Sequence, residues 1–183
     1  MPVSQVPFYV RLIPADQVDK TKARDPRAGN PMGPPGLIKG TDYGLEQKAV
    51  LSPLFSPCTA PPWSLMVAVD MISGDILWKT PFGKIDQLSP LPIGFEWGTP
   101  FAGGAITTAG GVVFIGATAD ERFRAFDVST GKKLLEIKAP TSAMASPMTY
   151  MANGKQYVVI ATGGHMWNYP KGISDEIIAY ALP

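Results

Sequence analysis

The sequence predicts an all-β fold built from β-propeller blades, and three observations lead to this prediction. Short runs of strand-forming residues follow one another from residue 63 onward, and many are separated by glycines or by Asp-Ser-Thr and Asn-Gly turns. No segment keeps helical periodicity over three turns. One hairpin pattern occurs twice, and two matching strand segments lie 45 residues apart, which is close to the length of one four-stranded blade.

The N-terminal third, residues 1–62, is expected to be a Pro/Gly-rich loop segment that packs on the blades. It contains eleven of the nineteen prolines, and its Pro and Gly steps interrupt any helix or long strand. We expect one strand there, at residues 8–12. Residues 63–183 carry the blades, so the chain is expected to form a single, incomplete domain.

Nine strands are expected in the second part, each short and bounded by turn residues. At roughly 40–45 residues a blade they make about three blades, whereas a propeller typically closes with about four to eight. The expected strands are residues 65–69, 76–79, 105–108, 112–117, 123–127, 134–137, 148–151, 157–162 and 176–182.

The repeated hairpin reads Ala-x-Asp, three residues, Gly, three residues, and then a large apolar residue. "AVDMISGDILW" covers residues 68–78, and "AFDVSTGKKLL" covers residues 125–135. The aspartate can accept hydrogen bonds from amides of the turn, and the glycine can adopt positive φ. Trp78 ends the first copy, and we expect it to pack between blades.

A second repeat pairs the only histidine with an aspartate. "VVFIGATAD" (112–120) matches "YVVIATGGH" (157–165), so Asp120 and His165 occupy equivalent positions. Adjacent blades present equivalent positions at the same height, and the two residues are therefore expected to be neighbours at the mouth of a channel. A nearby carboxylate would favour the imidazolium and place its pKa near neutrality. Without that register, His165 would more simply hydrogen-bond the backbone in a tight turn.

Composition limits the partners. The net charge of +1 provides no field for nucleic acid or an anionic membrane surface. The single cysteine, Cys58, excludes an internal disulfide and is expected to pack as a small hydrophobe. No stretch of eighteen apolar residues and no signal-peptide pattern occurs, so any export signal is expected in sequence outside this chain.

The later segments resemble the quinoprotein dehydrogenases, β-propeller enzymes that carry pyrroloquinoline quinone (PQQ). The Ala-x-Asp-x-x-x-Gly-x-x-x-Trp hairpin resembles their tryptophan-docking repeat. "GGAITTAGGVVFIGATADERFRAFDVSTGKKL", "SPMTYMANGKQYVVIATGGH" and "DEIIAYALP" are similar to the C-terminal end of the membrane-bound branch, which oxidises glucose, quinate or other polyols. "TDYGLEQKAVLSPLFSPCTAPPW" resembles the loop before those blades, so the resemblance covers about residues 41–183.

The resemblance implies an eight-bladed propeller with PQQ across its axis, on the periplasmic side of the inner membrane. Such an enzyme passes electrons from a sugar or polyol to ubiquinone. Trp97 could reach the cofactor edge or line the substrate mouth. The residues that the resemblance places near the cofactor are Asp120, His165, Phe101, Ala102, Gly103 and Gly104.

The resemblance also implies what this chain lacks. The catalytic base, the ligands of Ca²⁺ or Mg²⁺ and the cation that polarises the quinone belong to earlier blades of the family, and no catalytic or metal-binding residue is identified here. We therefore expect a C-terminal fragment that is inactive alone and whose partners are the missing N-terminal blades, a sugar or polyol, and ubiquinone. Open sheet edges favour self-association.

Two other functions fit the sequence less well. A serine hydrolase would need a G-x-S-x-G elbow, which does not occur. A non-catalytic binding or scaffold propeller is the main alternative, because it needs the hairpins but no catalytic residues. The segments "GGAITTAGG" and "ATGGH" favour the quinoprotein.

Overall fold

The structure is a computed structural model that describes residues 1–18, 36–53, 56–86, 94–165 and 172–181. It consists of two compact units, one formed by Met1–Gln5 with Pro61–Pro183 and the other by Val6–Ala60. All the sheets are antiparallel, as the all-β prediction requires. Among the described residues, no helix has the length and hydropathy needed to cross a bilayer.

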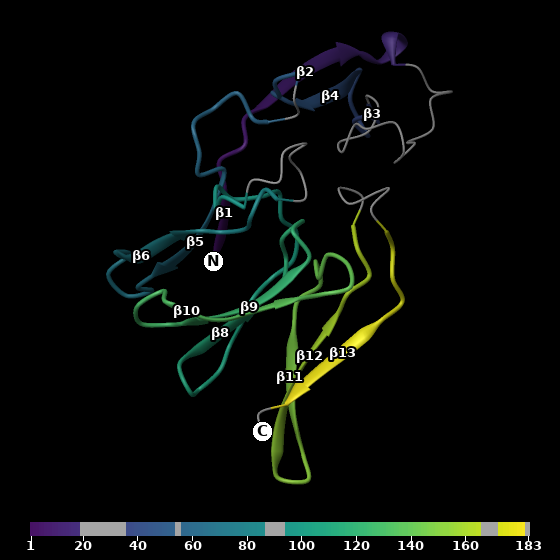
Figure 1. Cartoon of the computed structure of the whole chain (residues 1–183). Helices are drawn as coiled ribbons and strands as arrows, with labels where there is room; N and C mark the ends of the chain where they lie inside the picture. Colours follow the sequence, from purple (N-terminus) through teal and green to yellow (C-terminus); the bar gives the residue numbers. More distant parts are fainter. Residues whose placement is uncertain (19–35, 54–55, 87–93, 166–171, 182–183) are drawn as a thin grey trace. The chain divides into compact units, whose positions relative to one another are not determined.

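The larger unit contains three blades (Figure 1). The first blade consists of β1 (Pro2–Ser4), β5 (Ser64–Val69) and β6 (Ile76–Pro81). The second blade consists of β7 (Ile106–Thr107), β8 (Val112–Ile115), β9 (Arg122–Asp127) and β10 (Lys133–Lys138). The third blade consists of β11 (Met148–Ala152), β12 (Lys155–Ala161) and β13 (Ile177–Ala181). Strands β5 to β13 confirm the nine expected strands.

Strand β1 was not expected, because Pro2–Ser4 has no alternating pattern and finds its partner in Ser64–Met66, far along the chain. This pairing places the first residues of the chain in the larger unit rather than with the rest of residues 1–62.

The smaller unit is a three-stranded sheet, so it is more regular than the expected loop. Its strands are β2 (Phe8–Pro14), β3 (Gly36–Leu37) and β4 (Tyr43–Ala49), in the order β2-β4-β3. The expected strand at residues 8–12 is confirmed and extends to Pro14. Strand β4 was missed, although its buried residues, Gly44 and Glu46, alternate with the exposed Tyr43 and Leu45 as a half-buried strand requires. Cys58 is exposed, which corrects its expected packing.

The two hairpins share the turn chemistry that the repeat predicted. Asp70 Oδ1 accepts hydrogen bonds from the backbone N–H groups of Ile72 (2.8 Å) and Ser73 (2.9 Å). In the second copy, Asp127 Oδ1 accepts from the N–H groups of Ser129 (3.0 Å) and Thr130 (2.8 Å). Both hairpin glycines have positive φ, 80° at Gly74 and 71° at Gly131.

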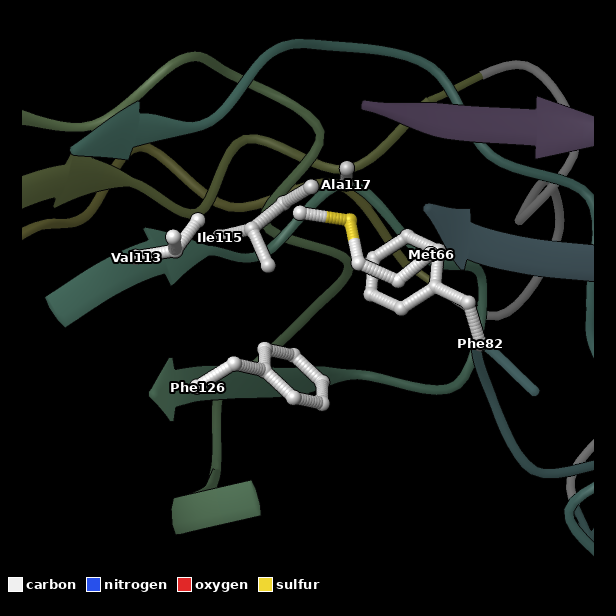
Figure 2. Packing of buried hydrophobic residues seen from close by; sticks show 6 residues of the cluster. All are labelled: Met66, Phe82, Val113, Ile115, Ala117 and Phe126. Atoms are coloured by element: carbon white, nitrogen blue, oxygen red, sulfur yellow. The ribbon is translucent and has the colours of Figure 1, made fainter. Parts of the chain in front are cut away.

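The blades pack through two apolar clusters because side chains alternate across the second blade. Val113 and Ile115 of β8 face Met66 and Phe82, which come from the first blade and the residue after it (Figure 2). The side chain between them, Phe114, joins the other cluster, whose buried residues are Phe123, Ala139, Ala143, Val158 and Ile160. The second blade is therefore buried on both faces.

Candidate functional site

A tight turn at residues 116–121 follows β8. Ala117 (φ 59°) and Glu121 (φ 57°) both have left-handed backbones without being glycine. The backbone N–H of Thr118 donates to Gly116 O at 2.7 Å, which closes the turn tightly. Such conformations cost about 1–3 kcal/mol each, and they persist only where the surroundings fix them.

One side of this turn holds the segment 101–104, which the family resemblance implies to lie near a cofactor. Phe101 forms an isolated β-bridge with Thr118. The backbone N–H of Ala102 donates to Ala117 O at 2.9 Å, and that of Ala119 donates to Pro100 O at 3.1 Å. The turn therefore fixes the start of the segment 101–104.

The two glycines of this segment pass close to the connection between the second and third blades. At Gly103 (φ 108°) an added Cβ would collide with Met144 O. The backbone N–H of Gly104 donates to Ser146 Oγ at 3.0 Å. Only glycine fits at Gly103, because both its φ and its spacing exclude a side chain.

The other side of the turn is linked to the segment that carries His165. The backbone N–H of Ala117 donates to Ala143 O at 2.6 Å, and that of Gly164 donates to Ser142 O at 3.1 Å. Residues 139–143 therefore connect the Asp120 turn to the end of the equivalent segment in the third blade. A direct contact between Asp120 and His165 stays a prediction.

Asp120 is fully buried, and both of its carboxylate oxygens are engaged. Oδ1 accepts from Thr118 Oγ1 at 2.6 Å and from Arg124 Nη1 at 3.2 Å. Oδ2 accepts from the backbone N–H of Lys84 at 2.7 Å and from Arg124 Nη2. The carboxylate thus joins the segment after β6 to the second blade.

His165 is half-buried, and burial lowers its pKa. This direction is opposite to the sequence expectation, in which the Asp120 carboxylate would favour the imidazolium. The cause is burial, because desolvation disfavours the charged imidazolium. At neutral pH the neutral ring is therefore favoured.

Arg124 and Glu136 extend the polar contacts on the face of the second blade that meets the first. Arg124 Nε donates to Glu136 Oε2 at 3.1 Å, and Lys84 Nζ donates to Glu136 Oε1 at 2.5 Å. Burial alone would raise the pKa of Glu136, but hydrogen bonds from Lys133 and Lys84 and the charge of Arg124 outweigh it and lower the pKa to about 2. Sequence reasoning missed this network, although Arg124 was visible as a cation inside an apolar strand, "RFRAFD".

Trp97 has different surroundings from the other predicted residues. Its ring stacks on Phe95 with centroids 4.7 Å apart and meets Trp63 edge-on at 5.9 Å. Its backbone O accepts from the N–H of Trp63 at 2.6 Å. The side chain is 37% exposed, so this aromatic group presents a partly open surface.

The described part of the chain contains no group of three or more His, Cys, Asp or Glu side chains that could hold a metal ion. The features that the structure does bring together are the turn at 116–121, the segment 101–104 and the connection that leads to His165.

Comparison with known proteins identifies the fold family. The family described as PQQ glucose/ethanol/alcohol dehydrogenase, beta-propeller domain, matches residues 1–158. Quinoprotein glucose dehydrogenase A of Acinetobacter calcoaceticus is 44% identical over 97% of this chain and 22% of its own length. The probable quinate dehydrogenase (quinone) of Xanthomonas campestris pv. juglandis is 38% identical over 96% of this chain and 23% of its own length.

A solved structure agrees with these relatives. The crystal structure of quinohemoprotein alcohol dehydrogenase from Comamonas testosteroni matches 89% of this chain and 20% of its own chain, with 28% identity and a TM-score of 0.52. The chain spans about a fifth of the length of the relatives that it matches. The chain therefore belongs to the PQQ-dependent glucose/ethanol/alcohol dehydrogenase family, as part of its β-propeller domain.

Proposed function

We propose that this chain contributes three propeller blades to a PQQ-dependent dehydrogenase that oxidises a sugar, polyol or quinate-type alcohol. The family match over residues 1–158 carries the proposal. The named activities of the relatives, which include glucose and quinate dehydrogenases, support the substrate class. These names favour an enzyme over a non-catalytic scaffold propeller.

The residues present fit one side of such a cofactor. PQQ is a flat group with three carboxylates, so an unpaired protein anion beside it would be unfavourable. The one buried carboxylate of the turn, on Asp120, is compensated by Arg124. Gly103 is exposed and His165 is half-buried, so a bound cofactor can reach the backbone of Gly103 and the imidazole of His165.

In the proposed enzyme, PQQ supplies an ortho-quinone that accepts two electrons and two protons from the alcohol. His165 and the segment 101–104 orient the cofactor, and the aromatic face of Trp97 covers its edge or the substrate entrance. Because burial lowers its pKa, His165 is neutral at pH 7 and can donate from one ring nitrogen and accept at the other. Asp120 does not contact the cofactor in this proposal, but stabilises the conformation of the turn at 116–121.

The remaining parts of the proposal concern the whole enzyme. The catalytic base and a Ca²⁺ or Mg²⁺ site belong to blades outside this chain. The electron acceptor is a quinone, as the name of the Xanthomonas relative suggests, and we propose ubiquinone at the periplasmic side of the inner membrane. Copies of the chain separated from the other blades associate through open sheet edges.

The variant His165→Asn in the enzyme that contains this chain tests the site. Loss of one hydrogen bond, worth about 0.5–1.5 kcal/mol, should raise the Kd of PQQ by about 2- to 13-fold. The Kd is measured by adding PQQ to apoenzyme, and quinone reduction is followed separately.

Thr149→Val provides the matched control. Thr149 is an exposed residue of β11 whose hydroxyl donates to Tyr157 O at 2.8 Å, and its removal should leave PQQ affinity unchanged. If His165→Asn changes neither PQQ affinity nor quinone reduction, the proposed role of His165 is wrong.

A further inference from the structure

The turn at 116–121 is fixed by one buried cation. The side chain of Arg124 is 2% exposed and comes from β9, which pairs with β8 directly before the turn (Figure 1). Its Nη1 donates to Thr118 Oγ1 at 2.8 Å and to Asp120 Oδ1 at 3.2 Å. Its Nη2 donates to Asp120 Oδ2, so the planar guanidinium forms hydrogen bonds with two residues of the turn.

These two residues lie within the strained part of the backbone. Thr118 directly follows Ala117, and Asp120 directly precedes Glu121, the two non-glycine residues with positive φ. Strained conformations persist where the surroundings over-determine them. The fork of Arg124 does this because it fixes both polar side chains at once, which a lysine ammonium cannot do with the same geometry.

Arg124 is itself held rigidly. Glu136 Oε2 accepts from its Nε at 3.1 Å, and its guanidinium carbon lies 5.8 Å from the centroid of the Phe82 ring. Phe82 belongs to the apolar cluster between the first and second blades (Figure 2). The conformation of the turn is thereby tied to the packing of two blades.

The turn at 116–121 also contacts the segments that we propose to lie beside the cofactor. The same turn binds Phe101 and Ala102 on one side and, through Ala143, the segment that leads to His165 on the other. We propose that Arg124 is a positioning residue, which keeps the strained turn in the conformation that presents residues 101–104 and His165 to the cofactor. This inference rests on the proposed function.

Positioning of the turn by Arg124 can be distinguished from a contribution of Arg124 to the stability of the fold. Replacing a buried ion pair by apolar groups of similar size is often neutral or stabilising, whereas the geometry that the pair imposed is lost. A positioning role therefore predicts that cofactor binding responds to Arg124 out of proportion to the thermal stability.

The test uses Arg124→Lys and Arg124→Met in the complete enzyme that contains this chain. Four properties are measured: the Kd of PQQ for apoenzyme, the absorption spectrum of bound PQQ, amide exchange in residues 116–121, and the thermal midpoint. Both variants should weaken PQQ binding by about tenfold or more, because the charge-assisted hydrogen bonds to Thr118 and Asp120 are lost or misplaced. Both should also speed exchange at the turn and alter the spectrum.

A double variant tests whether Arg124 acts through Asp120. If Arg124 acts through Asp120, Arg124→Met combined with Asp120→Asn should weaken PQQ binding no more than the stronger single variant does. Full additivity of the two effects on the Kd would contradict the route.

Two controls separate the alternatives. Arg11→Lys changes an exposed arginine that pairs with Glu46 at 2.7 Å in the smaller unit, and PQQ binding should not change. Phe126→Leu removes apolar contact from the inter-blade cluster, and it should lower the thermal midpoint without a tenfold loss of PQQ affinity.

The outcomes are distinct. Unchanged PQQ affinity in Arg124→Lys, with His165→Asn still impaired, overturns the positioning role alone. The positioning role is also overturned if the Arg124 variants lose PQQ affinity only in proportion to their loss of thermal midpoint, in the same proportion as Phe126→Leu. If Arg124→Lys speeds exchange at the turn but neither it nor His165→Asn changes PQQ affinity, the proposed role of this site in binding PQQ fails, and this inference fails with it.

Discussion

Two aspartate side chains, Asp70 and Asp127, stabilise the turns of the two repeated hairpins. Asp127 accepts hydrogen bonds from the hydroxyl groups of Ser129 and Thr130 and from their backbone N–H groups, and these bonds lower its pKa to about 2. Asp70 does the same in the first hairpin with Ser73 and Ile72, and its pKa is also lowered. The recurring aspartate of the repeat is thus a turn-forming acceptor that favours its ionised form.

Glu136 gives a pH prediction. Because its folded pKa is about 2 and its ordinary value is 4.5, the stability that it contributes is complete above about pH 4.5 and is lost as the pH falls toward 2. Glu136→Gln should lower the thermal midpoint at neutral pH and reduce the further loss between pH 4.5 and 2. Thermal unfolding at a series of pH values measures both effects, and an unchanged acid slope in the variant would count against this network.

At the residue scale the sequence predicted local chemistry better than distant pairing. The turn roles of Asp70 and Asp127 follow from neighbours within three residues. Asp120 has near partners in Thr118 and Arg124, but its hydrogen bond from the backbone of Lys84 does not follow from the sequence, because Lys84 lies 36 residues away and reaches the carboxylate only where the first two blades pack. The pKa of His165 is lowered, contrary to the expected preference for the imidazolium, and this direction could not be predicted because the burial of its ring could not be judged from the sequence.

The hairpins and strands also connect neighbouring blades. Trp78 in β6 donates from Nε1 to Val128 O at 2.8 Å, beside the turn of the second hairpin. An added Cβ on Gly131 would come within 2.5 Å of the Trp78 ring. The expected docking of Trp78 between blades is confirmed, and one repeat unit thus provides the surface that receives the tryptophan of the other.

Two glycine variants measure this docking. Gly131 (φ 71°) and Gly154 (φ 75°) both lie in hairpin turns, but an added Cβ on Gly154 meets nothing within 4 Å. Gly154→Ala should cost only the strain of a left-handed alanine, about 1–2 kcal/mol. Gly131→Ala adds a collision with Trp78 and should lower the thermal midpoint of the enzyme further. Equal effects of the two variants would mean that Trp78 does not depend on close contact with the hairpin.

At the element scale, periodicity and turn residues predicted β5 to β13, because each strand is bounded by residues that force a turn. They could not predict β1, whose register depends on a strand about sixty residues away. They also could not indicate that residues 139–143 bridge the second and third blades, since that segment shows no repeat and its role comes from contacts with residues distant in the sequence.

At the scale of the larger unit, three blades stack through apolar clusters, and a polar network lies between the first two. Each interface places loops of one blade against loops of the next, which is how residues separated in sequence, such as those at 101–104, 117–120 and 142–144, come to share one site. The 45-residue repeat predicted this equivalence of blades. The strained turn that organises the site could be recognised only in the structure.

The central claim is that PQQ binds beside the segment 101–104, the turn at 116–121 and His165. Amide hydrogen exchange of the complete enzyme with and without PQQ tests it most directly, because exchange reports which backbone segments become protected. The account predicts that PQQ protects residues 100–104, 116–121 and 161–165 and leaves the hairpin ends at 70–75 and 152–155 unchanged. Protection that omits all three segments, in an enzyme that demonstrably binds PQQ, would contradict it.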